Sequence, residues 1–184
     1  MAIEKLLVEY CAATLASIKT ASLFSAAVSS KQMLKEQIDY WNARMKEKGI
    51  CLFVLRVWDG RALIYVYRKR RLKADLKRPE VRAFLKSYGY INEDLEDALE
   101  HLKSRFSESS TFPHEIGVFL DYPLEDVKGF IKNKGQNYKL CGIWKVYCNE
   151  NDAKKLFQKY QKCREIYLQL WERGKSVMQL TVAA

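Results

Sequence analysis

The predicted fold is decided by residues 114–147, HEIGVFLDYPLEDVKGFIKNKGQNYKLCGIWKVY. Apolar residues alternate over 115–120, which predicts a short strand. Pro123 is followed by acidic residues and Gly135 by a polar stretch, which predicts that a helix begins and ends there. Residues 140–147 are aromatic and β-branched and predict the next strand. Two strands joined by one helix can pair in parallel through a right-handed crossover, so this unit is predicted to be strand–helix–strand.

A β-hairpin is predicted before this unit. Residues 50–57 are almost wholly apolar, which is typical of a strand that is covered on both faces. Asp59-Gly60 is the dipeptide that a type I′ turn prefers, and it would return the chain through residues 61–68. We therefore expect a mixed sheet of about four strands, formed by residues 50–57, 61–68, 115–120 and 140–147.

Helices are predicted on both sides of these strands. Apolar residues at helical spacing predict an amphipathic helix over residues 2–16. Further helix starts are indicated by the Ser29-to-Gln32 capping-box pattern, by Pro79, by Asn92, and by Asn149 or Asn151. The expected fold class is α+β, with several helices packed on the sheet in a single domain over residues 1–184.

The composition is that of a globular protein. Apolar residues make up 48% of the 184 residues and charged residues 29%. No apolar run approaches the ~18 residues that cross a bilayer. Charged residues interrupt the apolar pattern of the N-terminus, so we expect no signal peptide and a cytoplasmic location.

Cysteine spacing argues against a metal centre. The five cysteines are an odd number, and no pair has the C-x-x-C spacing that zinc sites and iron–sulfur clusters favour. We interpret them as structural thiols in a reducing compartment. The sequence identifies no cofactor.

The net charge of +10 indicates an anionic partner. Its main concentration runs from Arg68 to Arg82, with eight basic and two acidic residues. The cluster Arg68, Lys69, Arg70 and Arg71 is a candidate surface for an acidic protein. Nucleic-acid binding is an alternative, because basic clusters bind phosphate backbones, although no RNA- or DNA-binding motif accompanies this one.

A second candidate site is the segment 14–25, which is dense in small hydroxylated residues around Lys19. One interpretation is a tightly packed helix end and turn. The other is that Lys19 and the hydroxyl groups, including that of Ser22, hold an anion.

His114-Glu115 is the strongest candidate for catalysis. A histidine beside a carboxylate can act as general acid or base near neutral pH, and a position before a strand would place the pair at a sheet edge. The alternative is a structural histidine that bonds backbone groups. Lys145 and Tyr147 lie on the last predicted strand, where the lysine either binds an anionic ligand or extends to solvent.

Several blocks together resemble one known family. These are Thr14-Leu15-Ala16, Lys19, Ser22-Leu23-Phe24, His114-Glu115-Ile116-Gly117, Tyr122-Pro123, Glu125-Asp126-Val127, Gly129-Phe130-Ile131, Gly142 and Trp144-Lys145-Val146-Tyr147. The chain resembles, over nearly its whole length, an uncharacterised bacterial domain of unknown function common in clostridia-type anaerobes. The resemblance implies gene neighbours of flavodoxin and iron-uptake type, and therefore an acidic, redox- or iron-related partner.

Three functional hypotheses follow. The first is a binding or accessory protein for an acidic, flavodoxin-like partner, which electrostatic attraction would steer. The second is a small enzyme or ligand-binding protein for an anionic metabolite, using His114, Glu115, Lys19 and Lys145. The third is nucleic-acid binding through residues 68–82.

Overall fold

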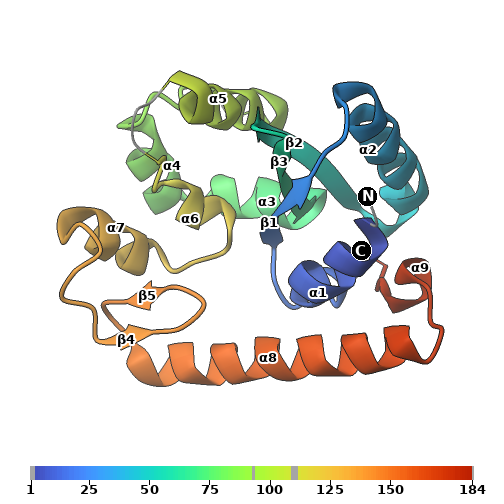
Figure 1. Ribbon diagram of the computed structural model, residues 1–184. Helices are drawn as coiled ribbons and strands as arrows, with labels where there is room; N and C mark the ends of the chain where they lie inside the picture. Colours follow the sequence, from blue (N-terminus) through green and yellow to red (C-terminus); the bar gives the residue numbers. More distant parts are fainter. Residues whose placement is uncertain (1–2, 93, 109–111, 184) are drawn as a thin grey trace.

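The computed structural model describes residues 3–92, 94–108 and 112–183. Figure 1 shows the helices and strands coloured in chain order from blue to red. Their order is α1 (Ile3–Leu15), β1 (Ala21–Ala27), α2 (Lys31–Met45), the 3-10 helix η1 (Lys46–Lys48), β2 (Ile50–Trp58), β3 (Arg61–Arg68), α3 (Lys69–Leu76), α4 (Pro79–Lys86), α5 (Leu95–Glu108), α6 (Ile116–Phe119), α7 (Leu124–Lys132), β4 (Leu140–Cys141), β5 (Lys145–Val146), α8 (Glu150–Glu172) and α9 (Val177–Leu180). The fold class is α+β.

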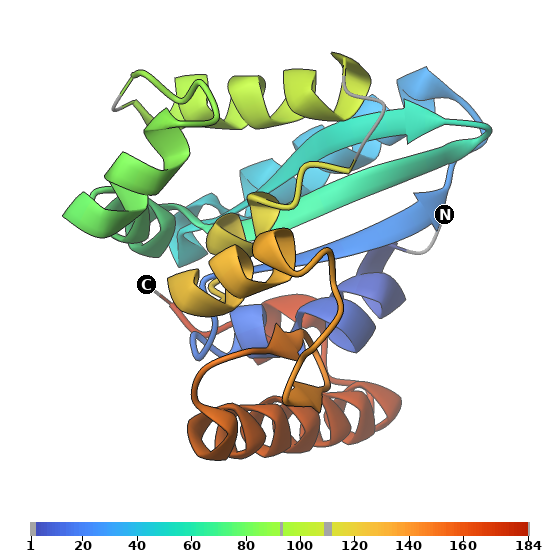
Figure 2. The same cartoon turned by 90° about the vertical axis from the view of Figure 1, so that its left-hand side faces the viewer.

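The central sheet has three antiparallel strands in the order β1-β3-β2, seen face-on in Figure 2. Asp59 and Gly60 join β2 to β3 with φ angles of 39° and 69°, the left-handed geometry that a type I′ turn requires. The expected mixed sheet of four strands is therefore wrong. Two of its strands, β2 and β3, are present, and the third strand of the sheet comes from elsewhere in the chain.

That third strand, β1, was not predicted. It pairs with β3 along its whole length, from Ala21 opposite Tyr67 to Ala27 opposite Arg61. The segment 14–25 therefore contains the helix end and turn of one interpretation, followed by a strand. Small residues make the strand weak by propensity, but they let α1 approach the sheet closely, with Thr14 Oγ1 and Ser22 Oγ 2.9 Å apart.

Residues 115–120 are not a strand, because they form the short helix α6 and its flanks. The amide of Gly117 donates to the carbonyl of His114, and that of Val118 donates to the carbonyl of Glu115. Every residue from Glu115 to Leu120 is buried. The apolar alternation therefore reflected a segment enclosed on all sides, rather than one face of a strand.

Residues 140–147 form a small hairpin in place of one long strand. β4 and β5 pair antiparallel, with Cys141 opposite Lys145, and the amide of Gly142 donates to the carbonyl of Trp144 in the turn. The predicted parallel crossover is wrong, because neither segment joins the central sheet. The helix predicted between them is present as α7.

Polar side chains start the other helices close to the predicted positions. Ser30 Oγ accepts from the amide of Met33 at the start of α2, and Asn149 caps α8. At α5 the first-turn amides donate to Asp94 Oδ1, whereas Asn92 bonds the side chain of Asp97. The predicted cap at Asn92 is therefore displaced by two residues.

The two faces of the sheet carry separate cores. One face packs on α1, α2 and α9 through Phe24, Ile64 and Val66. The other face, with Tyr65 and Tyr67, packs on α3 to α7. A third cluster joins β5 to α1 and α8, which run beneath the sheet in Figure 1. Among the described residues, no helix is both long and apolar enough to cross a bilayer.

Candidate functional site

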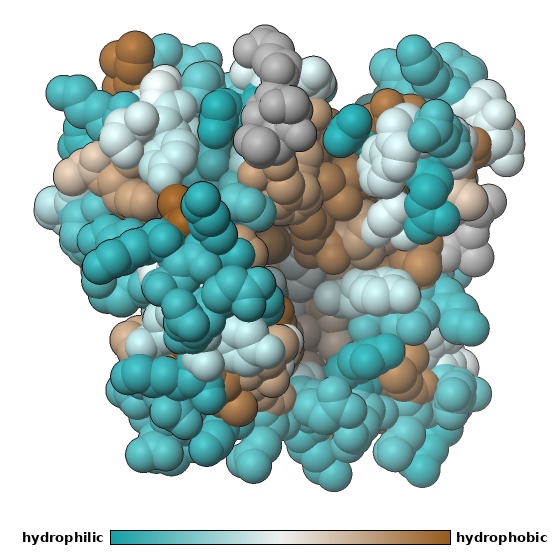
Figure 3. All heavy atoms as spheres, turned by 60° about the vertical axis from the view of Figure 1, so that its left-hand side comes forward, coloured by the Kyte–Doolittle hydropathy of each residue, from teal (hydrophilic) through white to brown (hydrophobic). Residues whose placement is uncertain are grey.

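The main candidate site is a hollow of about 400 Å³ between α6, α7 and the β4–β5 hairpin, which we call the aromatic pocket. Figure 3 shows apolar side chains, in brown, gathered in a hollow on the side of the molecule that carries these elements. The pocket is lined by Phe112, His114, Ile116, Gly117, Leu120, Tyr122, Asp126, Val127, Phe130, Cys141, Gly142, Ile143, Trp144 and Lys145.

Ring-to-ring contacts build two sides of the pocket. On one side, the His114 ring lies 4.8 Å from that of Phe130 and 5.7 Å from that of Phe112. On the other, Trp144 stacks on Tyr122 with 4.9 Å between ring centroids. The ring of Phe157 on α8 packs on Trp144 in an edge-to-face arrangement. The walls are therefore large, flat and apolar, a surface suited to a ring-containing molecule.

Asp126 holds the hairpin wall in place. Its carboxylate is buried and accepts hydrogen bonds from Trp144 Nε1 at 2.8 Å, from the Tyr147 amide at 2.8 Å and from the Cys148 amide at 3.0 Å. Burial alone would raise its pKa, but these hydrogen bonds together lower the pKa below the usual value. The Asp126 carboxylate is therefore charged, and its hydrogen bonds hold the β4–β5 hairpin in place.

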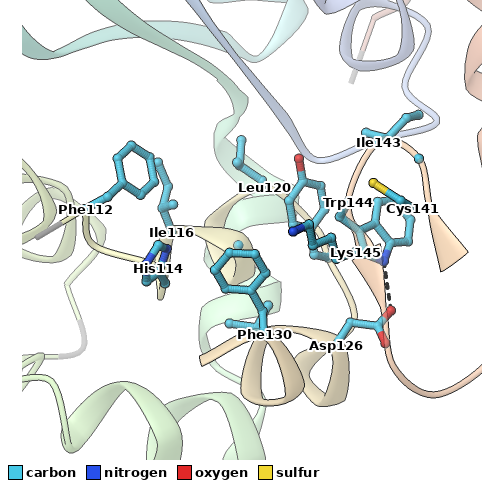
Figure 4. Close-up of a pocket in the computed structure, with 14 residues that line it drawn as sticks. Phe112, His114, Ile116, Leu120, Asp126, Phe130, Cys141, Ile143, Trp144 and Lys145 are labelled. Carbon is cyan, nitrogen blue, oxygen red and sulfur yellow. Dashed lines mark hydrogen bonds between the residues drawn. The ribbon is translucent and has the colours of Figure 1, made fainter. Parts of the chain in front are cut away.

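The polar groups that remain for a ligand lie at the rim. Figure 4 shows His114 at one end of the pocket and Cys141 and Ile143 at the other. Lys145 Nζ donates to the carbonyl of Gly135 at 2.7 Å and lies 4.8 Å from the ring centroid of Tyr138. An ammonium group has three donors, so this lysine can also bind an anionic group. The structure brings two predicted site residues, His114 and Lys145, to one pocket.

Glu115 lies apart from the aromatic pocket. The side chain is 1% exposed, and its Oε1 accepts from Arg105 Nε at 2.8 Å and from Tyr90 Oη at 3.5 Å. This ion pair raises the pKa of the Arg105 guanidinium. The predicted catalytic pair is therefore divided: His114 faces the pocket, and Glu115 ties α5 to the segment before α6. The sheet-edge setting expected for the pair is wrong.

Lys19 and Ser22 line a second, smaller hollow between α1, α8 and the β4–β5 turn. Lys19 is 6% exposed, with its Nζ 5.2 Å from the ring centroid of Tyr122. Burial lowers its pKa to about 8, against the opposing effect of Asp121. This hollow and the aromatic pocket share one lining residue, Ile143.

Tyr147, the remaining predicted ligand contact, packs on α7. Its ring lies so close to Gly129 that a Cβ there would come within 2.5 Å of the ring. Its hydroxyl is buried with no hydrogen-bond partner among the described residues. This position fits a packing role, and Tyr147 does not line the aromatic pocket.

The predicted basic cluster is divided between interior and surface. Arg68 is 2% exposed and donates to the carbonyls of Thr14, Leu15 and Val182, so it is not available to a partner. Lys69 pairs with Glu96, and Arg71 donates to the carbonyl of Ser17. Arg70 is exposed. Only three of the four cations are therefore at the surface or near it.

Cysteines and acidic groups are dispersed. All five cysteines are free thiols, with Cys141 and Cys148 exposed. Within the described ranges, His, Cys, Asp and Glu side chains form no group of three or more that could hold a metal ion.

Sequence reasoning assigned no functional role to several residues of the pocket. Phe112, Asp126, Phe130 and Trp144 define its walls. Phe130 and Trp144 are residue types that an ordinary core also contains, whereas Asp126 is a buried carboxylate and Phe112 is half exposed. Two indications were present: Asp126, Phe130 and Trp144 fall in the 114–147 stretch, and the same three residues stand in the blocks that resemble the family.

Comparison with protein families gives a match along residues 7–181 to the family described as "Protein of unknown function (DUF3793)". The chain belongs to this family. Searches of curated proteins and of solved structures found no match. This match confirms the predicted resemblance to a domain of unknown function. Membership of the DUF3793 family assigns no activity to the chain.

Proposed function

We propose that the protein binds a small, ring-containing molecule with an anionic group in the aromatic pocket. The observation that carries this proposal is a hollow of about 400 Å³ with rings on two sides and few polar groups. Ligand sites of proteins typically occupy ~300–1,000 Å³ and combine apolar walls with a few convergent polar groups. We also infer that residues 1–184 form one domain and that the protein acts in the cytoplasm.

The charge of the rim supports an anion over a cation. Asp126 is the carboxylate among the lining residues, and its oxygens already accept hydrogen bonds from the hairpin. Lys145 keeps donors for a ligand, and His114 is exposed at the other end. An apolar ring would lie between the walls, and its anionic group would meet Lys145 or His114.

A fluorescence titration with anilinonaphthalene sulfonate (ANS), itself a ring system with an anionic group, tests this proposal. We expect saturable binding with one ANS per chain. Phe112→Ala should weaken it by about threefold to tenfold, because the substitution removes one of the three rings on that side of the pocket. Phe112 is 52% exposed, so the variant should fold.

The matched control is Tyr40→Ala on α2, an aromatic residue that is 49% exposed and outside the pocket. Equal ANS affinity in wild type and both variants would contradict the proposal. His114→Ala and Lys145→Met should each weaken binding of ANS more than binding of a neutral analogue without the sulfonate, because they remove the side chains that would meet the anionic group.

Binding of an acidic protein partner is a second candidate function, and a different surface supports it. A hollow of about 410 Å³ between α3, α4 and the start of α5 is lined by Lys77, Arg82 and Lys86, with Ile91 80% exposed beside them. Together with the net charge of +10, this supports docking of an acidic, flavodoxin-like partner.

Binding to a purified flavodoxin at low and high salt tests the second candidate. We expect a salt-sensitive complex that Lys77→Glu weakens and Lys162→Glu, on the exposed face of α8, does not. Absence of a complex at low salt would contradict it. Tight binding of random DNA in the same assay would favour the nucleic-acid alternative.

A further inference from the structure

We propose that the hollow around Lys19 is a second site, which binds a small oxyanion, a carboxylate or a phosphate group, through the Lys19 ammonium. The hollow is separate from the aromatic pocket but shares the lining residue Ile143 with it. The smaller hollow has a volume of about 200 Å³, several times the ~30 Å³ that one water occupies in the liquid.

Lys19 is a buried cation without a counter-ion in contact. Its side chain is 6% exposed, and its Nζ lies between the rings of Tyr122 and Tyr160, at 5.2 and 5.9 Å from their centroids. No hydrogen bond or ion pair joins this nitrogen to another residue in the described ranges. The two rings provide a favourable cation–π environment but cannot replace hydrogen-bond acceptors.

The electrostatic cost of this arrangement points to a ligand. Burial lowers the pKa of Lys19 to about 8, so most of the side chains still carry their proton near neutral pH. A buried charge that lacks a partner is costly, and an oxyanion would provide both the opposite charge and acceptor atoms.

The rest of the lining is compatible with an anion. Arg164 contributes a second cation and pairs with Glu9 at 3.4 Å, so the carboxylate of the lining is already balanced. Tyr160 and Gln161 add donors from α8. Ser22 also lines the hollow, and its Oγ lies within hydrogen-bond distance of Thr14 Oγ1.

Titratable and charged groups lie around Lys19 on α1, after α6 and on α8, and of these Asp121 and Cys11 raise its pKa. They are Glu9, Tyr10 and Cys11 on α1, Asp121 and Tyr122 after α6, and Tyr160 and Arg164 on α8. Asp121, the carboxylate that most raises the pKa of Lys19, accepts a hydrogen bond from the Thr20 amide at 3.0 Å and lies 3.8 Å from the Arg71 guanidinium. Asp121 therefore does not form an ion pair with Lys19.

Isothermal titration calorimetry with sodium acetate and with inorganic phosphate tests the site. Each is titrated near pH 8 in two buffers of different ionisation enthalpy, which measures proton uptake. Because an oxyanion favours the charged lysine, binding should take up about half a proton per chain at a pH equal to the Lys19 pKa. The anion that binds more tightly identifies a carboxylate or a phosphate ligand.

Three variants separate the outcomes. Lys19→Met should weaken binding by about tenfold or more, whereas Lys162→Met on the exposed face of α8 should leave it unchanged. Lys19→Arg should bind without proton uptake, since arginine is always charged. Binding of neither anion to the folded wild type would overturn the proposal, as would equal affinity in Lys19→Met. Either result would leave the proposal of ANS binding in the aromatic pocket standing, because that proposal is tested by a separate titration.

Discussion

Asp126 and Trp144 join the two walls of the aromatic pocket through a hydrogen bond of 2.8 Å between the indole Nε1 and Oδ2. Asp126 lies on α7, and Trp144 lies in the turn of the β4–β5 hairpin. The hairpin has two residues in each strand, so it has little stability of its own. The buried carboxylate provides the anchor that its short ladder lacks.

Asp126→Asn should lower the free energy of unfolding by about 2–4 kcal/mol, because the amide turns one acceptor into a donor and leaves buried N–H groups unpaired. Denaturant unfolding followed by circular dichroism measures the change. The neighbouring variant Glu125→Gln, whose side chain is 68% exposed, should change the value by less than about 0.5 kcal/mol.

The same variant has a defined pH dependence. The pKa of Asp126 is lower in the folded protein than in the unfolded chain, so its stabilising contribution is present above about pH 4 and is lost as the pH falls through the folded pKa. The difference between wild type and Asp126→Asn should therefore shrink in acid. A difference that stays constant down to about pH 2 would show that the carboxylate charge has no such role.

Arg68 and Arg70 provide a second prediction, because they differ in burial within one basic run. Arg68→Met should destabilise the fold by about 2–4 kcal/mol, since it leaves the carbonyls of Thr14, Leu15 and Val182 without their donor. Arg70→Met, at an exposed position, should cost less than about 0.5 kcal/mol. Similar effects of the two substitutions on thermal unfolding would contradict the interior position of Arg68.

Lys19 gives a third prediction, in the alkaline range. Its folded pKa of about 8 lies below the ordinary value of 10.5, so the unfolded chain binds more protons between these two values. Stability due to this group therefore rises with pH over that window. Relative to Lys19→Met, wild type should gain about 3 kcal/mol between about pH 7 and pH 10.5 in buffers free of carboxylate and phosphate.

Comparing the two proteins at each pH cancels the titration of the tyrosines and cysteines that they share. Urea unfolding at a series of pH values provides the measurement. A constant difference between wild type and Lys19→Met would mean that the lysine is solvated, and the account of its burial would then fail.

The sequence predicted the parts of the fold that depend on local chemistry. Asp59-Gly60 and the apolar strand before it define β2 and β3, and Ser30 and Asn149 start their helices through side-chain bonds to nearby amides. β1 could not be predicted in the same way. Its alanines and serines have low strand propensity, and it is a strand because β3 offers a free edge to pair with.

For residues 114–147, the sequence predicted burial but not all of the secondary structure. Their hydrophobic pattern located a buried unit correctly, but periodicity over six residues cannot separate a strand from a short helix that is buried all round. The pocket arises from contacts across this unit, such as Trp144 on Asp126 and His114 on Phe130. Adjacent residues, His114 and Glu115, were predicted to act together, and the helical turn at this point directs them to different partners.

Binding in the aromatic pocket is tested most directly by nuclear magnetic resonance of isoleucine methyl groups during a titration with ANS. Ile116 and Ile143 line the pocket, whereas Ile38 and Ile64 lie in the core on the other face of the sheet. We predict that the methyl signals of Ile116 and Ile143 shift with one saturation curve while those of Ile38 and Ile64 stay in place. Shifts confined to isoleucines outside the pocket, or no shifts at all, would contradict the proposed binding site.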